Sequence, residues 1–138
     1  MQRTLGIIKP DALAAGRAGR ILSQIEAAGL RVEGLRLVQL SEAQAQSFYA
    51  VHRQRPFFDS LVAFMTSGPC VVMVLAADDA IERWRTLMGA TDPAKADAGT
   101  LRKLYAESIQ NNAVHGSDGP DTARTEVAYF FSSVDLVG

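Results

Sequence analysis

One of the two histidines of the chain lies in a loop whose composition could hold it in a fixed pose. Residues 111–119 read Asn-Asn-Ala-Val-His-Gly-Ser-Asp-Gly, with His115 at the centre. Asparagine and glycine tolerate tight or left-handed backbone conformations, and Ser117 and Asp118 add side-chain acceptors nearby. Because an imidazole changes its charge near neutral pH, His115 is a candidate for chemistry. The spacing alone leaves open whether it is functional or makes only a local hydrogen bond.

The other polar candidates are scattered along the chain. Lys9 ends an apolar segment, Thr91 lies in an irregular stretch at residues 90–99, and Arg85 and Arg102 fall on expected helices. Taken singly, each of these residues is typical of a solvated surface side chain and does not indicate a site. The chain has no Gly-x-x-x-x-Gly-Lys-Ser/Thr phosphate loop, no dinucleotide-binding glycine pattern and no Gly-x-Ser-x-Gly motif. Two histidines far apart and one cysteine also give no metal-ligand spacing.

Length and charge narrow the class of protein. The chain has 138 residues, with 14 Lys and Arg against 15 Asp and Glu and a net charge of −1. We expect a single domain over residues 1–138, and nucleic acid is not expected as the main partner because there is no global positive field. The longest apolar run, Cys70–Ala77, is far shorter than the ~20 residues that span a membrane, so no membrane span is expected. The single cysteine, within that run, indicates a reducing, cytoplasmic compartment.

Strands and helices must position the polar candidates. Residues 4–8, 31–40 and 70–75 predict strands, and the last is continuous and apolar, as a central strand buried on both faces should be. Residues 107–120 are turn-rich and expected to be irregular. The mixture predicts an α/β sandwich, with one sheet covered by helices. Start and stop signals predict helices over 21–28 before Gly29, from a Ser41–Gln44 capping box through His52, from Pro56 to Met65, from Asp78 or Asp79 to Gly89, from Thr100 to Tyr105, and from a cap at Asp121 onward.

Seven short motifs occur along the chain in an order that one protein family shares. They are Ile8-Lys9-Pro10-Asp11, Arg55-Pro56-Phe57-Phe58, Thr66-Ser67-Gly68-Pro69, Met88-Gly89-Ala90-Thr91 with Pro93, Gly99-Thr100-Leu101-Arg102, Asn112-Ala113-Val114-His115-Gly116-Ser117-Asp118, and Glu126 before the final aromatic run. With these motifs the chain resembles the nucleoside diphosphate kinases from about Arg3 to Phe131. Seven motifs in the same order argue against an accidental similarity.

The resemblance implies a ferredoxin-like α+β sandwich, a four-stranded antiparallel sheet covered by helices. It implies transfer of the γ-phosphoryl group from a nucleoside triphosphate, typically ATP, to a nucleoside diphosphate. The reaction would be ping-pong through a phosphohistidine at His115, with Mg²⁺ carried in on the nucleotide phosphates and no metal ligand from protein side chains. The resemblance also implies a homo-oligomer. The short C-terminal end and the Ala90-Thr91 pair favour a tetramer over a hexamer or dimer.

The resemblance also assigns catalytic roles. His115 would be the nucleophile, and Glu126 with Ser117 would orient its ring and stabilise positive charge on it. Tyr49 and Lys9 would lie beside the transferred phosphoryl group. Phosphoryl transfer depends mostly on positioning and on charge stabilisation, so cations matter more here than further acid–base groups.

The implied nucleotide contacts divide into three groups. A base stacked on an aromatic ring presents its π-face, which all bases have, so such a site should tolerate both purines and pyrimidines, and ribose as well as deoxyribose. The groups are Arg85, Thr91 and Arg102 for the phosphates, Lys9 and Asn112 for the ribose hydroxyl, and Phe57 for the base with Leu61 and Ile109 beside it.

Several residues receive packing roles instead. Phe58, Cys70 and Trp84 are assigned to the core, and helical spacing makes His52 a packed or partly exposed side chain. Asp92 stands where family members commonly carry Asn. Its carboxylate would repel phosphate if it pointed toward Thr91, whereas a loop acidic residue more often faces water.

Two other functions fit part of the pattern. An inactive relative could bind nucleotide and regulate partners, and a related module could meet nucleic acid. The presence of His115, Lys9 and Arg102 favours an enzyme over the first alternative. The absence of a basic excess favours an enzyme over the second.

Overall fold

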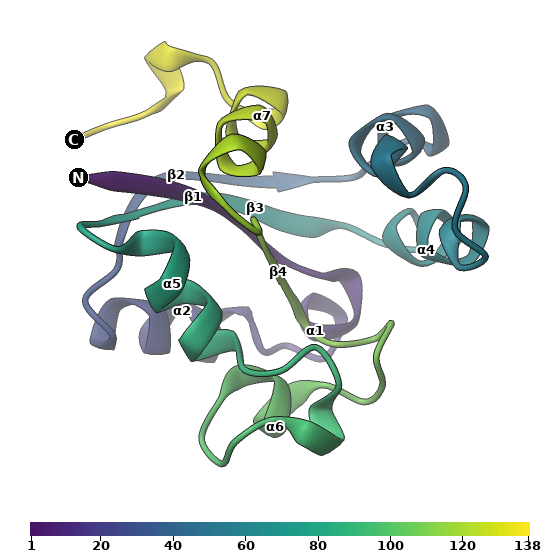
Figure 1. The fold of residues 1–138 in the computed structure, drawn as a ribbon, viewed down its shortest axis with the longest axis horizontal. Coiled ribbons are helices and arrows are strands. Elements are labelled where there is room, and N and C mark those ends of the chain that lie inside the picture. The colour runs from purple at the N-terminus through teal and green to yellow at the C-terminus, as the bar shows by residue number, and fades with distance from the viewer.

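Four strands form one antiparallel sheet in the order β2-β3-β1-β4 in the computed structural model, which describes all 138 residues (Figure 1). This confirms the predicted four-stranded α+β sandwich of the ferredoxin-like type. None of its helices is long and apolar enough to cross a membrane. The strands are β1 (Gln2–Ile8), β2 (Arg31–Val38), β3 (Cys70–Ala77) and β4 (Val114–Gly116). The helices are α1 (Pro10–Ala14), α2 (Ala18–Ala27), α3 (Glu42–Phe48), α4 (Phe58–Met65), α5 (Ala80–Met88), α6 (Leu101–Tyr105) and α7 (Pro120–Phe130), with 3-10 turns at Ala50–His52, Pro93–Lys95 and Ser133–Asp135.

The central strands bring the two ends of the chain together. Every residue of β3 is buried, as its continuous apolar sequence predicts. β3 pairs with β1 along seven residues, and β4 pairs with the other edge of β1, where Ile7 lies opposite His115. Lys9 follows directly after β1. The sheet therefore carries Lys9 and His115 to the same place, although 105 residues separate them in sequence.

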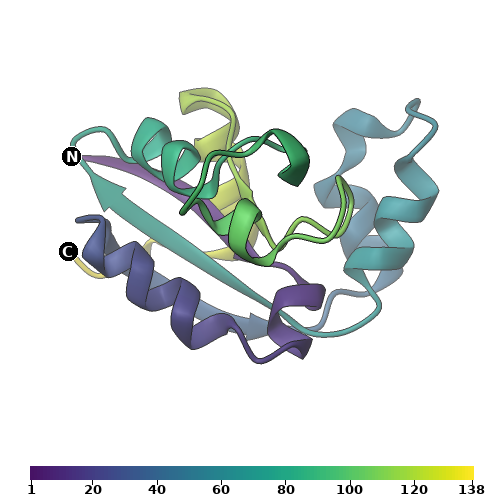
Figure 2. The same cartoon turned by 90° about the horizontal axis from the view of Figure 1, so that it is seen from below.

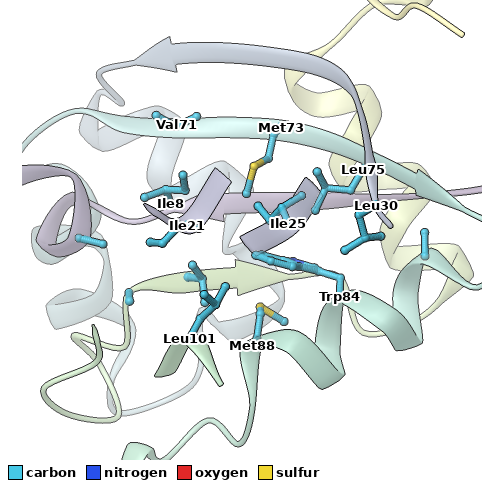
Figure 3. Packing of buried hydrophobic residues seen from close by; sticks show 14 of the residues in the cluster. Ile8, Ile21, Ile25, Leu30, Val71, Met73, Leu75, Trp84, Met88 and Leu101 are labelled. Carbon is cyan, nitrogen blue, oxygen red and sulfur yellow. The ribbon is translucent and has the colours of Figure 1, made fainter. Parts of the chain in front are cut away.

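Side chains of β3 alternate between two apolar clusters, one on each face of the sheet. Val71, Met73 and Leu75 face the cluster under α2 and α5, which also contains Trp84 (Figure 3). The alternate residues of β3 face the cluster under α3, α4 and α7. Two perpendicular views show α2 and α5 on one side of the sheet and α7 on the other (Figures 1 and 2). The helices are thus fixed relative to the sheet by two dry interfaces.

Trp84 packs directly onto the two strands that carry the candidate site. Its ring is fully buried, and a Cβ built at Gly116 would lie 2.6 Å from it and from Met88. A Cβ at Gly6 would lie 2.9 Å from the Met73 side chain and 3.3 Å from the indole nitrogen. The indole Nε1–H donates to the carbonyl oxygen of His115 at 3.1 Å. The glycines therefore let one large side chain hold the backbone of β4.

Most predicted helix boundaries agree with the structure. Ser41 and Gln44 form a complete capping box at the start of α3. Gly29 and Gly89 follow α2 and α5 with φ of +80° and +85°, a conformation that glycine adopts without steric cost. Asp79 lies at the N-cap of α5, but its side chain makes no capping hydrogen bond.

One predicted loop and several predicted helix ends differ from the structure. Part of the segment expected to be irregular is β4, because the free edge of β1 offers it a partner. The helix expected to run through His52 ends at Phe48 and continues as a 3-10 turn. α4 begins at Phe58, leaving Pro56 in the preceding turn. α7 begins at Pro120, so Asp121 lies inside its first turn and not at the cap. α1 was not predicted.

Candidate active site

A cleft of about 490 Å³ opens beside β4, between the α3–α4 pair, α5 and α6. Glu126 and Ser117 are not part of its lining and lie behind His115. The site residues assigned from the sequence that line the cleft are Lys9, Tyr49, Phe57, Leu61, Arg85, Thr91, Arg102, Ile109, Asn112 and His115. A larger hollow of about 590 Å³ lies near both termini, but its buried carboxylate, Glu33, is already paired with Arg3 and Arg31.

His115 is held by a carboxylate from α7. Its Nε2 lies 2.9 Å from Oε1 of Glu126, which also accepts a hydrogen bond from the Ser117 hydroxyl at 2.8 Å. Burial raises the pKa of Glu126, but the hydrogen bonds from His115 and Ser117 outweigh it and leave that pKa below its usual value. An ionised carboxylate only accepts, so Nε2 must carry the proton. In the neutral ring the lone pair is then on Nδ1.

Aromatic side chains form one wall beside the imidazole. The rings of Phe48 and Tyr49 meet the His115 ring edge-on, with centroids 5.7 and 6.3 Å away. The Tyr49 hydroxyl is buried and has no hydrogen-bond partner within the protein. Burial first, and then the nearby Cys70 and Glu126, raise the pKa of Tyr49, so the phenol stays protonated. The Tyr49 hydroxyl is therefore a hydrogen-bond donor without a partner at the edge of the cleft.

Lys9 is a buried ammonium at the bottom of the cleft. It is 7% exposed, and its Nζ donates to Oδ1 of Asn112 at 2.8 Å. The Asn112 amide in turn donates to the carbonyl oxygen of Thr91. Burial, followed by repulsion from Arg102, lowers the pKa of Lys9 to about 8. Because burial and the charge of Arg102 destabilise the ammonium, an anion that binds in the cleft would stabilise it.

Arg102 is a second desolvated cation. Its Nη1 and Nη2 donate to the carbonyl oxygens of Gly89 and Val114, whereas its buried Nε has no partner. Burial, and then the charge of Arg85, lower the pKa of Arg102 to about 10. Arg85 itself is about half-exposed and pairs with the Asp118 carboxylate at 3.2 Å. Three cations thus share one wall and have a single exposed carboxylate between them, an arrangement that favours a polyanion.

The outer end of the cleft is apolar and open. Phe57 and Ile109 are 46% and 61% exposed, and the half-buried Leu61 lines the same cleft. Phe58, the next residue after Phe57, is buried in the core, as predicted. The two sides of this opening are joined by a hydrogen bond from the Ser60 hydroxyl to Gln110. The geometry fits a flat ring at the opening and charged groups deeper inside.

The structure adds residues that the sequence reasoning did not place in the site. His52, interpreted as a packed or partly exposed side chain, is half-buried and lines the cleft between Tyr49 and Phe57, with ring centroids 6.5 and 5.5 Å away. Its spacing of three residues from Tyr49 puts both on one side of a turn, a signal that could have found it. Gln110, Gly116 and Asp118 also line the cleft. Asp92 does not line the cleft, because its carboxylate accepts a hydrogen bond from the Ala94 N–H and caps the 3-10 turn.

Fold and cleft define a ferredoxin-like α+β protein with an oriented histidine beside a cationic wall. Residues 2–136 match the family model described as nucleoside diphosphate kinase. A nucleoside diphosphate kinase of Syntrophotalea carbinolica is 62% identical over 137 residues, covering 99% of this chain and 100% of that protein. One of Maricaulis maris is 56% identical and covers 100% of this chain and 99% of that protein.

Solved structures agree with the sequence matches. The nucleoside diphosphate kinase of Aquifex aeolicus superposes with a TM-score of 0.96 at 40% identity and covers 99% of both chains. That of Halobacterium salinarum, in complex with CDP, superposes with a TM-score of 0.95 at 40% identity, over 99% of this chain and 91% of that one. The chain belongs to the nucleoside diphosphate kinase family.

Proposed function

We propose that this chain transfers the γ-phosphoryl group of a nucleoside triphosphate to a nucleoside diphosphate through a phosphohistidine at Nδ1 of His115. The observation that carries the proposal is the 2.9 Å contact between Nε2 and an ionised Glu126. It keeps the proton on Nε2 and leaves Nδ1 as the nucleophile. Trp84 holds the same residue through its backbone carbonyl, so the ring is positioned from two directions.

Each half-reaction exchanges one bond at phosphorus. The Nδ1 lone pair forms a bond to the γ-phosphorus while the bond from that phosphorus to the bridging oxygen breaks, and its electron pair leaves on the nucleoside diphosphate. The imidazole becomes positively charged, and Glu126 stabilises that charge. A terminal oxygen of a second nucleoside diphosphate then attacks the phosphorus, and the electron pair of the N–P bond returns to Nδ1. No general base is required at either step.

The wall of the cleft accounts for charge stabilisation. Lys9, Arg85 and Arg102 are cations along one side, and the Tyr49 hydroxyl is a donor without a partner. In a water-poor site such groups stabilise the charge that spreads over a transferring phosphoryl group. A wall of cations holds the phosphates and not a bare metal ion, so Mg²⁺ would enter as part of the nucleotide substrate.

The open, apolar end of the cleft is where the nucleoside part of the substrate would bind. We propose that the base stacks on Phe57 beside Leu61 and Ile109, and that Lys9 and Asn112 contact the ribose hydroxyl. The related Halobacterium salinarum enzyme has been solved in complex with CDP, a pyrimidine nucleotide. Because stacking does not depend on the hydrogen-bonding edge of the base, we expect purine and pyrimidine, ribo and deoxyribo nucleotides to be substrates.

We also propose that the chain forms a homo-oligomer, with a tetramer favoured. β2 is an edge strand whose outer side is unpaired, and Leu35 and Leu37 on it are 51% and 68% exposed. An unpaired apolar edge is a template for another strand. Light scattering coupled to size-exclusion chromatography would give the molar mass, and a mass of one chain at all concentrations would contradict the proposal.

The experiment that tests the reaction is an intact-mass assay after brief exposure to Mg-ATP. We expect the wild type to gain one acid-labile phosphoryl group that added GDP or dCDP removes. His115→Ala should gain none and should still bind Mg-ATP, because Phe57 and the cations remain. If the wild type binds ATP and stays unmodified, a nucleotide-binding regulatory role becomes the better account.

A further inference from the structure

The loop that carries the candidate nucleophile contains an unusual backbone turn. Ala113 has φ of +73°, and it is the only residue other than glycine with a positive φ. The N–H of Val114 donates to the carbonyl oxygen of Asn112 at 2.8 Å, which closes a three-residue γ-turn around Ala113. A γ-turn with positive φ is rare and strained for any residue that has a Cβ. The turn is fully buried.

The position of the turn ties it to the site. Asn112, on one side of it, accepts the hydrogen bond from Lys9, and His115 follows two residues after it on β4. A change in the dihedral angles of Ala113 would therefore move the sugar-contacting amide and the imidazole relative to each other. Such strain persists only where the surrounding structure holds the backbone in place.

Residues at the start of α1 restrain the backbone of Ala113 through hydrogen bonds. The carboxylate Oδ2 of Asp11 accepts the N–H of Ala113 at 3.1 Å, and the backbone N–H of Lys9 donates to the carbonyl oxygen of Ala113 at 2.8 Å. Both peptide groups that flank the strained residue are thus hydrogen-bonded to one short segment, at Lys9 and at Asp11. Asp11 does not line the cleft, so it makes this contact without being exposed to the nucleotide.

Placing the carboxylate of Asp11 at this position costs desolvation free energy. It is partly buried, and its second carboxylate oxygen, Oδ1, is buried without a hydrogen-bond partner. Burial raises the pKa of Asp11 despite opposing hydrogen bonds from Ala12 and Ala113 and the charge of Lys9. A first-turn carboxylate that served only the helix could remain in water, as Asp121 does at the start of α7.

We propose that Asp11 is a positioning residue, which holds the γ-turn at Ala113 and thereby sets the relative placement of Asn112 and His115. The inference rests on the proposed function, because its consequence is the rate at which His115 is phosphorylated. It gives the acidic residue after Lys9-Pro10 a role through the loop, without contact to substrate.

The test uses one substitution that removes the carboxylate, Asp11→Ala, and a second that removes the strain the carboxylate restrains, Ala113→Gly. In Asp11→Ala, phosphorylation of His115 at saturating Mg-ATP should slow on the order of 10- to 100-fold, as expected when a catalytic group is misplaced by about 1 Å. Glycine adopts positive φ without the Cβ penalty. Asp11→Ala combined with Ala113→Gly should therefore regain most of the lost rate. Asp11→Asn keeps an oxygen that can accept from Ala113 and should stay close to wild type.

Two controls separate positioning from a general loss of structure. Asp121→Ala is the matched variant, because Pro120-Asp121 opens α7 as Pro10-Asp11 opens α1, and it should keep the wild-type rate. Unfolding curves are recorded for every variant. Because Ala113→Gly also relieves strain in the folded state and so raises stability, rates are compared at a temperature where the unfolding curves show every variant fully folded. The inference is overturned if folded Asp11→Ala keeps the wild-type rate, if Ala113→Gly gives no rescue, or if neither Asp11→Ala protein folds.

A second readout keeps this inference apart from the reaction itself. The affinity for Mg-ADP depends on Asn112, on the other side of the turn, and should weaken in Asp11→Ala and recover in the double variant. If wild type is never phosphorylated but the affinity follows this pattern, the phosphohistidine proposal fails and the role of Asp11 stands. If wild type is phosphorylated and neither the rate nor the affinity changes in Asp11→Ala, the phosphohistidine proposal stands and the role of Asp11 fails.

Discussion

Replacing Glu126 by glutamine isolates the charge that faces the imidazole. The amide has nearly the same shape and keeps an oxygen for the Ser117 hydroxyl, so packing on α7 changes little. It loses the negative charge that stabilises a positive ring. It can also rotate and donate to Nε2, which would move the ring proton to Nδ1 and block the nucleophile.

The magnitude follows from the geometry. Oε1 lies 2.9 Å from Nε2, and the two side chains are only 19% and 20% exposed. Because the ring charge is shared by both nitrogens, the mean separation is about 4 Å, which gives about 4 kcal/mol at an effective dielectric constant of about 20. Partial exposure reduces this to roughly 2–4 kcal/mol, since solvent screens the pair. We therefore expect phosphorylation of His115 to slow on the order of 30- to 1,000-fold.

A rapid-quench, single-turnover assay with intact-mass detection measures this rate at saturating Mg-ATP. Ser117→Ala removes a charge-assisted hydrogen bond to Glu126 but keeps the carboxylate charge in both the ground state and the transition state, so the step should slow only about fivefold, equivalent to about 1 kcal/mol. Glu82→Gln, at an exposed carboxylate on α5, is the matched control and should have no effect. A rate for Glu126→Gln within threefold of wild type, in a folded protein that binds Mg-ATP normally, would refute the assignment of the charge and the tautomer.

Two further predictions concern binding. Phe57→Ala should weaken the binding of all nucleotides by a similar amount, on the order of 1–3 kcal/mol, as measured by calorimetry with purine and pyrimidine diphosphates; a loss confined to one base would contradict stacking. The pKa of Lys9 is lowered to about 8, so the ammonium is charged below that pH and neutral above it. Affinity for Mg-ADP should therefore fall as pH rises from 7 to 9, and in Lys9→Met this pH dependence should disappear; an unchanged profile in Lys9→Met would show that another group titrates.

Much of the fold followed from local chemistry. The continuous apolar run that became β3 could be buried only between two layers, and the capping box at Ser41 and the stop at Gly29 depend on neighbouring residues alone. The residues assigned to the site, whose motifs follow one another in the order of a known family, line one cleft or lie directly behind it. The resemblance, not spacing, assigned Glu126 to His115, since nothing local relates a helix residue to a loop eleven positions earlier.

Other features depend on contacts between distant segments. β4 has too few residues to predict as a strand and exists because β1 presents a free edge. His52 lines the cleft because the turn after α3 places it beside Phe57, whereas helical spacing alone suggested a packed or partly exposed side chain without a place in the site. The fall in the pKa of Lys9 requires burial and the charge of Arg102, neither of which can be seen in the order of residues.

By itself the sequence determined the layers, the family and the identity of the chemical groups, because apolar periodicity and short motifs are written in neighbouring residues. Only the tertiary structure decided which nitrogen of His115 is free, how far the cations are desolvated and how Asp11 restrains the turn at Ala113. These properties depend on distances between side chains that the chain brings together from opposite ends. Hydrogen-bond geometry and local dielectric vary over a few ångströms, and only packing sets them on that scale.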